Sequence, residues 1–404
     1  MGEGKFPRRT FLAGSLAIPL VIPAFASSTP KLRVAVIGAG AFGGWTALFL
    51  LRNGAQVTLF DAWGPGNARA SSGGETRVIR GVYGPNRIYV KWTVRSFQLW
   101  QEAEKVWNRK IYTKTNAIWM IRANQKDDYE KAAMPLLEAE GLPYQKLTTS
   151  EASKLYPQIN FDDIGWVLKE EEAGFLLARQ ACQCVLDSFV SEGGEYRMLS
   201  AKRGSEGSLQ LSDGSTFQAD AYVFACGPWL SELFPELMVG RLIEPTRQEV
   251  FFFGTPAGED RWTEKKMPVW IDHGERLIYG VPGNERRGFK IADDTRGEPF
   301  NPTNAERKIT PDKLEAARKF LAHRFPDLKN APLVESRVCQ YENSPDQHFI
   351  IDQHTQMKNV WIVGGGSGHG FKHGPAVGEY AAGLVLGKQK PDPFFQLDRF
   401  RKGK

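Results

Sequence analysis

The chain alternates between short apolar runs and stretches with helical spacing, and this alternation begins at Leu32. Leu32–Ile37 is mostly apolar and is followed by several glycines, as expected of a buried strand that ends in a tight turn. Trp45–Asn53 then has the spacing of a helix that Gly54 ends, and Gln56–Asp61 is a second apolar run. This order of strand, turn, helix and strand predicts an α/β fold.

The same patterns divide the rest of the chain. Helical spacing predicts helices over Tyr89–Trp107, Asp127–Glu140, Thr149–Tyr156, Ala178–Gly193, Pro311–Phe325 and Ala376–Gly387. Apolar runs predict strands at Tyr112–Arg122, Tyr196–Leu199, Leu209–Leu211, Thr216–Gln218, Ala219–Trp229, Pro245–Phe253, Val269–Ile271, Leu277–Gly280, Phe289–Ala292 and Pro332–Tyr341. The block from 245 to 292 is rich in strands and has an antiparallel character.

These elements predict two interleaved domains. The first is a Rossmann-like α/β domain assembled from residues 31–90, 197–240 and 335–390. The second is an α+β domain with an antiparallel sheet, assembled from residues 91–196 and 241–334. Residues 391–404 form a C-terminal tail, and the antiparallel sheet is expected to cover a ligand held by the first domain.

Three glycines directly after the first predicted strand have the spacing of a dinucleotide-binding turn. Gly38, Gly40 and Gly43 allow the turn and a close approach of the backbone to a pyrophosphate, which the N-terminus of the next helix faces. Asp61 ends the second strand, about twenty residues further on, and can bind a ribose hydroxyl. This motif fits both FAD and NAD.

Composition excludes several classes of function. The chain has 404 residues, a net charge of +6 and 24% charged residues, and its basic residues are scattered, so no nucleic-acid-binding surface is predicted. The four cysteines do not have the spacing of a zinc site, and no metal site is expected. Cys182 and Cys184 fall in a predicted helix, where residues two apart point away from each other, so a disulfide framework is not expected either.

The first thirty residues predict an export signal. Arg8 and Arg9 precede an apolar run, Leu12–Phe25, and Ala24–Ala26 offers a cleavage site with small residues. The paired arginines followed by Phe-Leu resemble a twin-arginine signal, which exports folded proteins with their cofactors. We therefore expect a periplasmic or secreted protein that uses the twin-arginine machinery and has no stable membrane span. A short membrane anchor is the alternative.

A glycine-rich stretch near the C-terminus suggests a flat ligand. Val338–Asp352 contains a cysteine two residues before a tyrosine, and Val360–His373 contains five glycines, all of them before Lys372. Such glycines let a backbone pass close to a ring that a Cβ would contact. In another stretch, Arg77 and Arg80 could face one cavity if their segment is helical, although a pair of surface arginines is the simpler interpretation.

Three motifs together resemble the monomeric sarcosine oxidase group of the D-amino-acid-oxidase-like flavoproteins. They are Gly74–Arg80 (Gly-Glu-Thr-Arg-Val-Ile-Arg), Cys339–Asp352, and Gly366–Lys372 (Gly-Ser-Gly-His-Gly-Phe-Lys). The resemblance extends from Leu32 to about Lys388 and includes N-methyltryptophan, pipecolate and fructosyl-amino-acid oxidases. It implies an FAD-dependent oxidase that converts the C–N bond of an amino acid or N-alkyl amino acid to an imine and releases hydrogen peroxide.

The resemblance also implies roles for individual residues. Cys339 matches a cysteine joined by a thioether to the flavin, and Tyr341 matches a tyrosine of the substrate pocket. Arg80 and Lys372 match the pair that binds the substrate carboxylate, while Arg77 and Lys290 match an arginine near the flavin and a lysine that activates dioxygen. The implied cofactor contacts are Gly38, Gly40, Phe42, Gly43, Asp61, Ala62, Ser71, Ser72, Thr76, Arg77, Gly227, Trp229, Cys339, Gly366, Gly368, Gly370, Phe371 and Lys372.

The sequence also departs from the family pattern. Gly73 and Asp294 stand where sarcosine oxidases carry active-site histidines, and Gln340 and Glu342 replace the usual Met and Thr. The two lost histidines count against sarcosine itself as the substrate, and Asp294 would favour a cationic or polar substrate if it points inward.

Two other functions stay open. One is a dehydrogenase of the same fold that passes electrons to a quinone or a protein. The other is a non-catalytic flavoprotein, which is less favoured because the set of cationic residues is intact.

Overall fold

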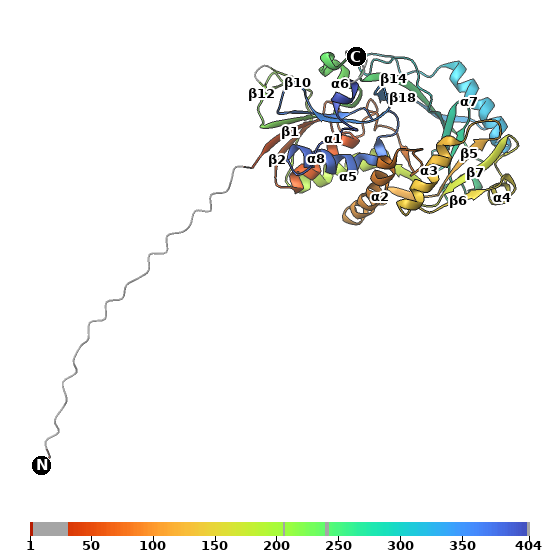
Figure 1. Ribbon diagram of the computed structural model, residues 1–404, viewed down its shortest axis with the longest axis horizontal. Coiled ribbons are helices and arrows are strands. Elements are labelled where there is room, and N and C mark those ends of the chain that lie inside the picture. The colour runs from red at the N-terminus through yellow and green to blue at the C-terminus, as the bar shows by residue number, and fades with distance from the viewer. Residues whose placement is uncertain (3–30, 205–206, 239–241, 402–404) are drawn as a thin grey trace. The chain divides into compact units, whose positions relative to one another are not determined.

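The computed structural model describes residues 1–2, 31–204, 207–238 and 242–401, and the chain divides into two units, 1–31 and 32–404. The predicted export signal lies outside the described residues. Every helix and strand of the described residues lies in the second unit (Figure 1). Because 32–404 form one compact unit, the domain boundaries within it stay a prediction.

The first sheet confirms the predicted α/β architecture. Its order is β19-β20-β13-β1-β2-β9, with parallel pairing except between β19 and β20. Its strands are β1 (Arg33–Ile37), β2 (Gln56–Phe60), β9 (Glu195–Arg197), β13 (Ala221–Phe224), β19 (Ile350–Gln353) and β20 (Val360–Gly364).

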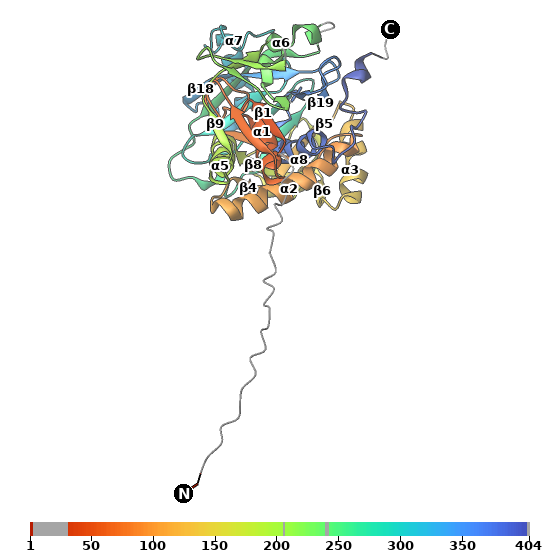
Figure 2. The same ribbon diagram turned by 90° about the vertical axis from the view of Figure 1, so that its left-hand side faces the viewer.

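Both faces of this sheet are buried, by different partners. On one face Val34 and Val36 pack in a core with helices α1 (Ala41–Arg52), α5 (Ala178–Ser191) and α8 (Gly374–Val385). On the other face Ala35 and Ile37 pack in a core with the small sheet β10-β11-β12. That small sheet consists of β10 (Ala201–Arg203), β11 (Leu209–Leu211) and β12 (Thr216–Phe217), and α8 also packs against the long helix α2 (Arg87–Trp107; Figure 2).

Helix α1 begins at Ala41, so the prediction that it begins at Trp45 is wrong. Glycine is a poor helix former, and Gly43 and Gly44 therefore weaken the sequence signal. In the folded chain close packing requires glycine at position 43 and leaves little room for a side chain at position 44. A Cβ on Gly43 would lie 1.9 Å from the carbonyl oxygen of Gly38. A Cβ on Gly44 would lie 3.2 Å from Val185.

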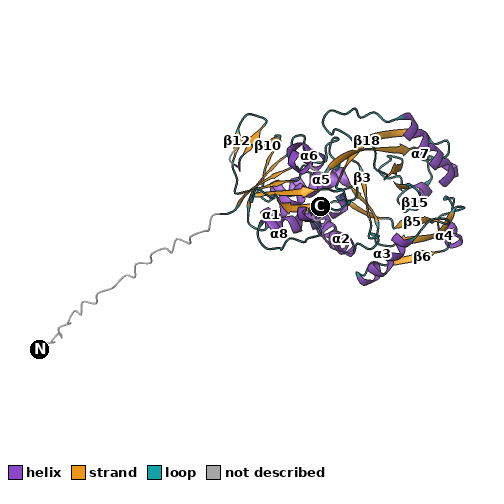
Figure 3. Ribbon diagram, turned by 45° about the horizontal axis from the view of Figure 1, so that its top comes forward, coloured by secondary structure: helices purple, strands orange, loops and turns teal. Residues whose placement is uncertain are grey.

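The second large sheet has eight strands in the order β18-β14-β17-β16-β15-β5-β7-β6 (Figure 3). All neighbours pair antiparallel except β15 and β5, so the antiparallel prediction holds for most of the sheet. Its strands are β5 (Ala117–Arg122), β6 (Tyr144–Leu147), β7 (Ile164–Glu170), β14 (Glu244–Phe253), β15 (Val269–His273), β16 (Leu277–Val281), β17 (Phe289–Asp293) and β18 (Leu333–Asn343).

The three-stranded sheet β3-β8-β4 differs from the sequence prediction in two ways. The predicted strand Tyr112–Arg122 is two strands in different sheets, because the chain turns at Asn116, whose φ is +62°. The segment with Arg77 and Arg80 is not helical, since β3 covers Thr76–Ile79. The strand β8 (Gly174–Leu177) pairs with both β3 and β4 (Tyr112–Lys114).

The remaining helices are α3 (Asp128–Ala139), α4 (Thr149–Leu155), α6 (Leu230–Leu233) and α7 (Pro311–Arg324). Helix α7 packs its buried Leu321 in a core with Trp270 and Phe289 of the eight-stranded sheet. Within the described residues, no helix is long and apolar enough to cross a membrane.

A buried ion network joins α7 to the eight-stranded sheet. Asp272, which is 1% exposed, accepts hydrogen bonds from Arg324 at 2.9 Å and from Arg122 at 2.8 Å. The side chain of Arg324 is 0% exposed and also pairs with Asp163 at 2.8 Å. Removing one partner of a buried ion pair leaves the other charge without compensation.

We expect Asp272→Ala to lower the free energy of unfolding by about 3 kcal/mol, because Arg122 and the buried Arg324 then share Asp163 in place of two carboxylates. Denaturant titration followed by circular dichroism measures the change. Glu315→Ala is the matched control, since Glu315 pairs with Lys319 on the exposed side of α7 and its loss should leave the curve unchanged. Equal curves for both variants would show that the buried network does not stabilise the fold.

Candidate functional site

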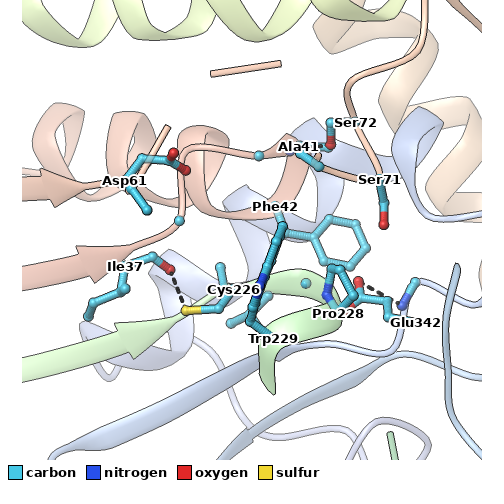
Figure 4. Close-up of a pocket in the computed structure, with 18 of the residues that line it drawn as sticks. Ile37, Ala41, Phe42, Asp61, Ser71, Ser72, Cys226, Pro228, Trp229 and Glu342 are labelled. Atoms are coloured by element: carbon cyan, nitrogen blue, oxygen red, sulfur yellow. Dashed lines mark hydrogen bonds between the residues drawn. The ribbon is translucent and has the colours of Figure 1, made fainter. Parts of the chain in front are cut away.

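A cavity lies at the carboxyl ends of β1, β2 and β13, where open α/β sheets bind their ligands (Figure 4). Tyr341, predicted for the substrate pocket, also lines this cavity. The predicted cofactor residues on its lining are Gly38, Gly40, Phe42, Asp61, Ala62, Ser71, Ser72, Arg77, Gly227, Trp229, Gly366, Gly368, Gly370 and Phe371.

The glycine turn forms one end of the cavity. Gly38 has a φ of +105°, and a Cβ there would lie 2.4 Å from the carbonyl oxygen of Ala225. Gly43 lies behind the turn and permits its approach to α1. Helix α1 begins directly after Gly40, which provides no side-chain cap. The N–H of Ala41 donates to Oγ of Ser72 at 3.1 Å, and the positive end of the helix suits an anion at this end.

Asp61 fixes the shape of the turn. Its carboxylate accepts hydrogen bonds from the backbone N–H groups of Ala39 at 2.8 Å, Trp63 at 2.9 Å and Gly64 at 2.8 Å. Burial raises the pKa of Asp61, and these three donors oppose that rise. The acid predicted from the sequence therefore lies on the cavity wall and already organises two backbone segments.

Cys339 and Lys290 lie near Arg77, which lines the cavity, although neither of the two is itself on the lining. Nη2 of Arg77 is 3.5 Å from Sγ of Cys339 and donates to the carbonyl oxygen of Ser71. Nζ of Lys290, on β17, donates to the carbonyl oxygen of Thr76 at 3.0 Å. Lys290 is 2% exposed, and burial together with the nearby Arg77 lowers its pKa to about 7.

A second cavity adjoins the first and contains the predicted carboxylate-binding pair, Arg80 and Lys372. Arg77, Gly368 and Phe371 line both cavities. Arg77 and Arg80 do share a cavity, although not because they lie on a helix. Strand β3 ends at Ile79, and the chain leaves the strand before Arg80.

Tyr83 links Lys372 to two histidines, the buried His373 and the half-buried His369. Nζ of Lys372 lies 2.8 Å from Oη of Tyr83 and 2.8 Å from the carbonyl oxygen of His369. Oη of Tyr83 is also 2.7 Å from Nε2 of His373 and 3.3 Å from Nδ1 of His369. Burial lowers the pKa of Lys372 well below its ordinary value, and Arg80 acts in the same direction.

Asp294 points inward and provides an acid opposite these cations. It lines the second cavity and accepts a hydrogen bond from Oη of Tyr341 at 2.6 Å. Burial raises its pKa, while Tyr341, Arg80 and Lys372 oppose the rise. The second cavity therefore offers three cationic side chains and one carboxyl group to a small ligand.

Several site residues carried no signal in the sequence. Glu170 accepts from the N–H groups of Gly81 and Val82 and from Nε1 of Trp119, and so fixes the loop behind Arg80. Arg80 also lies 4.8 Å from the centre of the Trp119 ring. The contacts of Glu170 join residues 51 to 89 positions apart, which no local motif can show. Glu342 stood inside a recognised motif and could have been found there.

Comparison with known proteins shows the same family throughout the chain. Residues 33–384 match the family described as "DAO: FAD dependent oxidoreductase". The chain is 30% identical to monomeric sarcosine oxidase of Arthrobacter sp. (strain TE1826), with 91% of this chain and 96% of that protein covered. It is 28% identical to N-methyl-L-tryptophan oxidase of Salmonella heidelberg (strain SL476), with 92% and 98% covered.

Solved structures show the same fold. L-Proline dehydrogenase from P. horikoshii has a TM-score of 0.80 at 19% identity, covering 93% of this chain and 99% of its own. Glycine oxidase from Geobacillus kaustophilus has a TM-score of 0.74 at 19% identity, covering 92% and 98%. With the family match over residues 33–384, these findings show that the chain belongs to the DAO family of FAD-dependent oxidoreductases.

Proposed function

We propose that this chain oxidises the C–N bond of an amino acid or N-alkyl amino acid, giving an imine that water hydrolyses. The observation that carries the proposal is the position of Arg80 and Lys372 in a cavity that shares Arg77, Gly368 and Phe371 with the cofactor cavity. A carboxylate held by the first two residues would lie beside the cofactor. Relatives named sarcosine oxidase and N-methyl-L-tryptophan oxidase support this class of substrate.

The residues of the first cavity fit FAD. The N-terminus of α1 suits the pyrophosphate, and Asp61 suits a ribose hydroxyl. At the other end, Gly368 has a φ of +81°, and a Cβ there would lie 2.6 Å from the ring of Tyr341, so this loop leaves no room for a side chain. When bound, FAD would supply the two-electron oxidation and the transfer of electrons to dioxygen.

Charge decides how the second cavity would bind its substrate. Arg80 can hold a carboxylate through two parallel N–H groups, and Lys372 can add a third charge-assisted bond. A bound carboxylate would also favour the protonated form of Lys372, which burial disfavours without a ligand. Asp294 lies opposite and favours a substrate that presents an N–H group or another donor.

We further propose that Lys290 promotes the reaction with dioxygen and that Cys339 tethers the cofactor. A buried cation near the flavin would stabilise the negative charge that forms on dioxygen. The contact of Cys339 with Arg77, which lines both cavities, supports a position of the sulfur at their junction. Transfer to a quinone or a protein acceptor is the alternative to dioxygen.

The export route is also a proposal. Arg8 and Arg9 with the apolar run Leu12–Phe25 support folded export through the twin-arginine machinery to the periplasm or beyond. Fractionation of cells that make the full chain tests it. Mature protein outside the cytoplasm supports the route, and retention of all flavoprotein in the cytoplasm contradicts it.

The substrate class is tested by an anaerobic screen of amino acids and N-methyl amino acids that follows loss of the flavin absorbance. At least one carboxylate-bearing amine should bleach the flavin. Arg80→Met should then lower kcat/KM about 10- to 100-fold, because a charge-assisted bond contributes about 1.5–3 kcal/mol. Arg87→Met, which changes an exposed residue on α2, is the control. Equal bleaching by amines without a carboxylate would contradict the proposal.

Lys290→Met should slow reoxidation of the reduced flavin by oxygen about 100-fold and leave its reduction by substrate almost unchanged. Because the wild-type lysine loses its charge as pH rises through about 7, the wild-type reoxidation rate should fall over the same range and the variant's should not. Stopped-flow absorbance separates the two half-reactions, with Lys114→Met as an exposed control. Equal slowing of both half-reactions would remove this role from Lys290.

Cys339→Ala should release its flavin on acid precipitation, while the wild-type flavin should stay with the protein pellet. Cys226→Ala is the matched control, because Cys226 also lines the cofactor cavity and should not affect attachment. The absorbance of the supernatant and the intact mass of the protein measure the outcome. Free flavin from the wild-type protein would show that the attachment is not covalent.

A further inference from the structure

Glu342 places a carboxyl group in the wall of the cofactor cavity, and one of its two oxygens accepts no hydrogen bond from the described residues. The residue lies on β18, is 8% exposed and lines the cavity. Its Oε1 accepts a hydrogen bond from the N–H of Gly366 at 3.2 Å. Its Oε2 is buried and has no hydrogen-bond partner among the described residues. Figure 4 shows the side chain near Pro228, on the side of the cavity away from Asp61.

Three glycines leave the space that this carboxyl group occupies. A Cβ on Gly364 would lie 3.3 Å from Oε2, and a Cβ on Gly366 would lie 3.1 Å from Oε1. A Cβ on Gly227 would lie 3.8 Å from Oε2. Gly227 follows β13 while the other two end or follow β20, so separate segments surround the carboxyl group. The wall is therefore shaped to hold it at a defined place.

No cationic side chain compensates Glu342 in the part of the chain that the structure describes. The backbone amides of Gly365 and Gly366 favour the carboxylate, but burial outweighs them and raises the pKa of Glu342 to about 7. The titratable groups around it are the Cys226 thiol and, further off, Asp61. Burial raises the pKa of Cys226 well above its ordinary value, so this thiol stays neutral near pH 7.

We propose that Glu342 is a cofactor-contact residue whose neutral carboxyl group donates a hydrogen bond from Oε2 to an acceptor atom of FAD. The proposal rests on FAD occupying the first cavity. An unpaired buried oxygen is unfavourable, and FAD offers ring nitrogens, carbonyl oxygens and ribityl oxygens as acceptors. The carboxylate form could only accept a bond and would repel negative charge on the cofactor.

This contact links a proton to the redox state of the cofactor. Reduction adds two electrons to FAD, and added negative charge favours the protonated form of Glu342. Above about pH 7, where Glu342 is ionised beside the oxidised cofactor, reduction should therefore draw one proton from solvent onto Oε2. Below that pH the proton is already present. The electrons come from the reductant, and the proton comes from water.

The test uses the flavin-loaded protein and two optical measurements that need no substrate. The flavin absorbance of the oxidised protein is titrated against pH, and the midpoint potential is measured against pH with dithionite and indicator dyes. The wild-type spectrum should show a one-proton step near pH 7. Above that step, the midpoint potential of the wild type should fall more steeply with pH than that of Glu342→Gln. The difference in slope should correspond to one additional proton taken up per two electrons. The neutral carboxamide of Glu342→Gln can still donate a hydrogen bond.

Lys290→Met is the matched control, since Lys290 also titrates near pH 7 and lies by the same cofactor. Because Lys290 can give a step of its own, the comparison is made in the Lys290→Met background, where the step of Glu342 should persist and should vanish when Glu342→Gln is added. If Glu342→Gln loads flavin poorly, Glu342→Thr provides a smaller neutral replacement in which the step should also vanish. A step that survives when either Glu342 replacement is combined with Lys290→Met, or a Lys290→Met spectrum without a step, would overturn the proposal. Both measurements remain informative even if no amine bleaches the flavin.

Discussion

The pairing of β18 with β14 is the constraint on which both cavities depend. The two strands pair along almost their whole length, and β18 thereby belongs to the eight-stranded sheet. Successive side chains of a strand point to opposite faces, so Cys339 and Tyr341 lie on one face of β18 and Gln340 and Glu342 on the other. A shift of one residue in the register would exchange these two pairs.

The path of the chain after β18 connects the two large sheets around the cofactor cavity. Directly after the strand, β19 and β20 join the parallel sheet, and the glycine loop 364–370 returns toward Tyr341 and Glu342. One continuous segment therefore connects the sheet that carries the glycine turn with the sheet that covers it. The cofactor cavity lies between these two parts of the same segment and the N-terminal turn.

Burial of positive charge gives the site its chemical character. Lys290 and Lys372 are almost completely buried, and each contacts a backbone carbonyl oxygen in place of a carboxylate. Burial and neighbouring arginines lower both lysine pKa values. Burying these positive charges lowers the stability of the fold, because the lysines lose the water that solvates them in the unfolded chain. A bound anion would stabilise the same charges, so the arrangement favours anion binding.

The sequence by itself determined the α/β start, the antiparallel block and the identity of the cofactor turn, because these depend on local periodicity and on glycines at fixed spacing. It misplaced the start of α1 and missed the break at Asn116, because tertiary packing overrides local preference at both places. It also named Arg77 and Arg80 for one cavity while assuming a helix that does not exist.

Only the tertiary structure decided which charges meet. It placed Asp294 against Tyr341, Glu170 behind Arg80, and Glu342 in the cavity wall, where no cationic side chain of the described residues pairs with it. Burial and the approach of residues distant in the chain set these environments, and neither is encoded in any local stretch of residues.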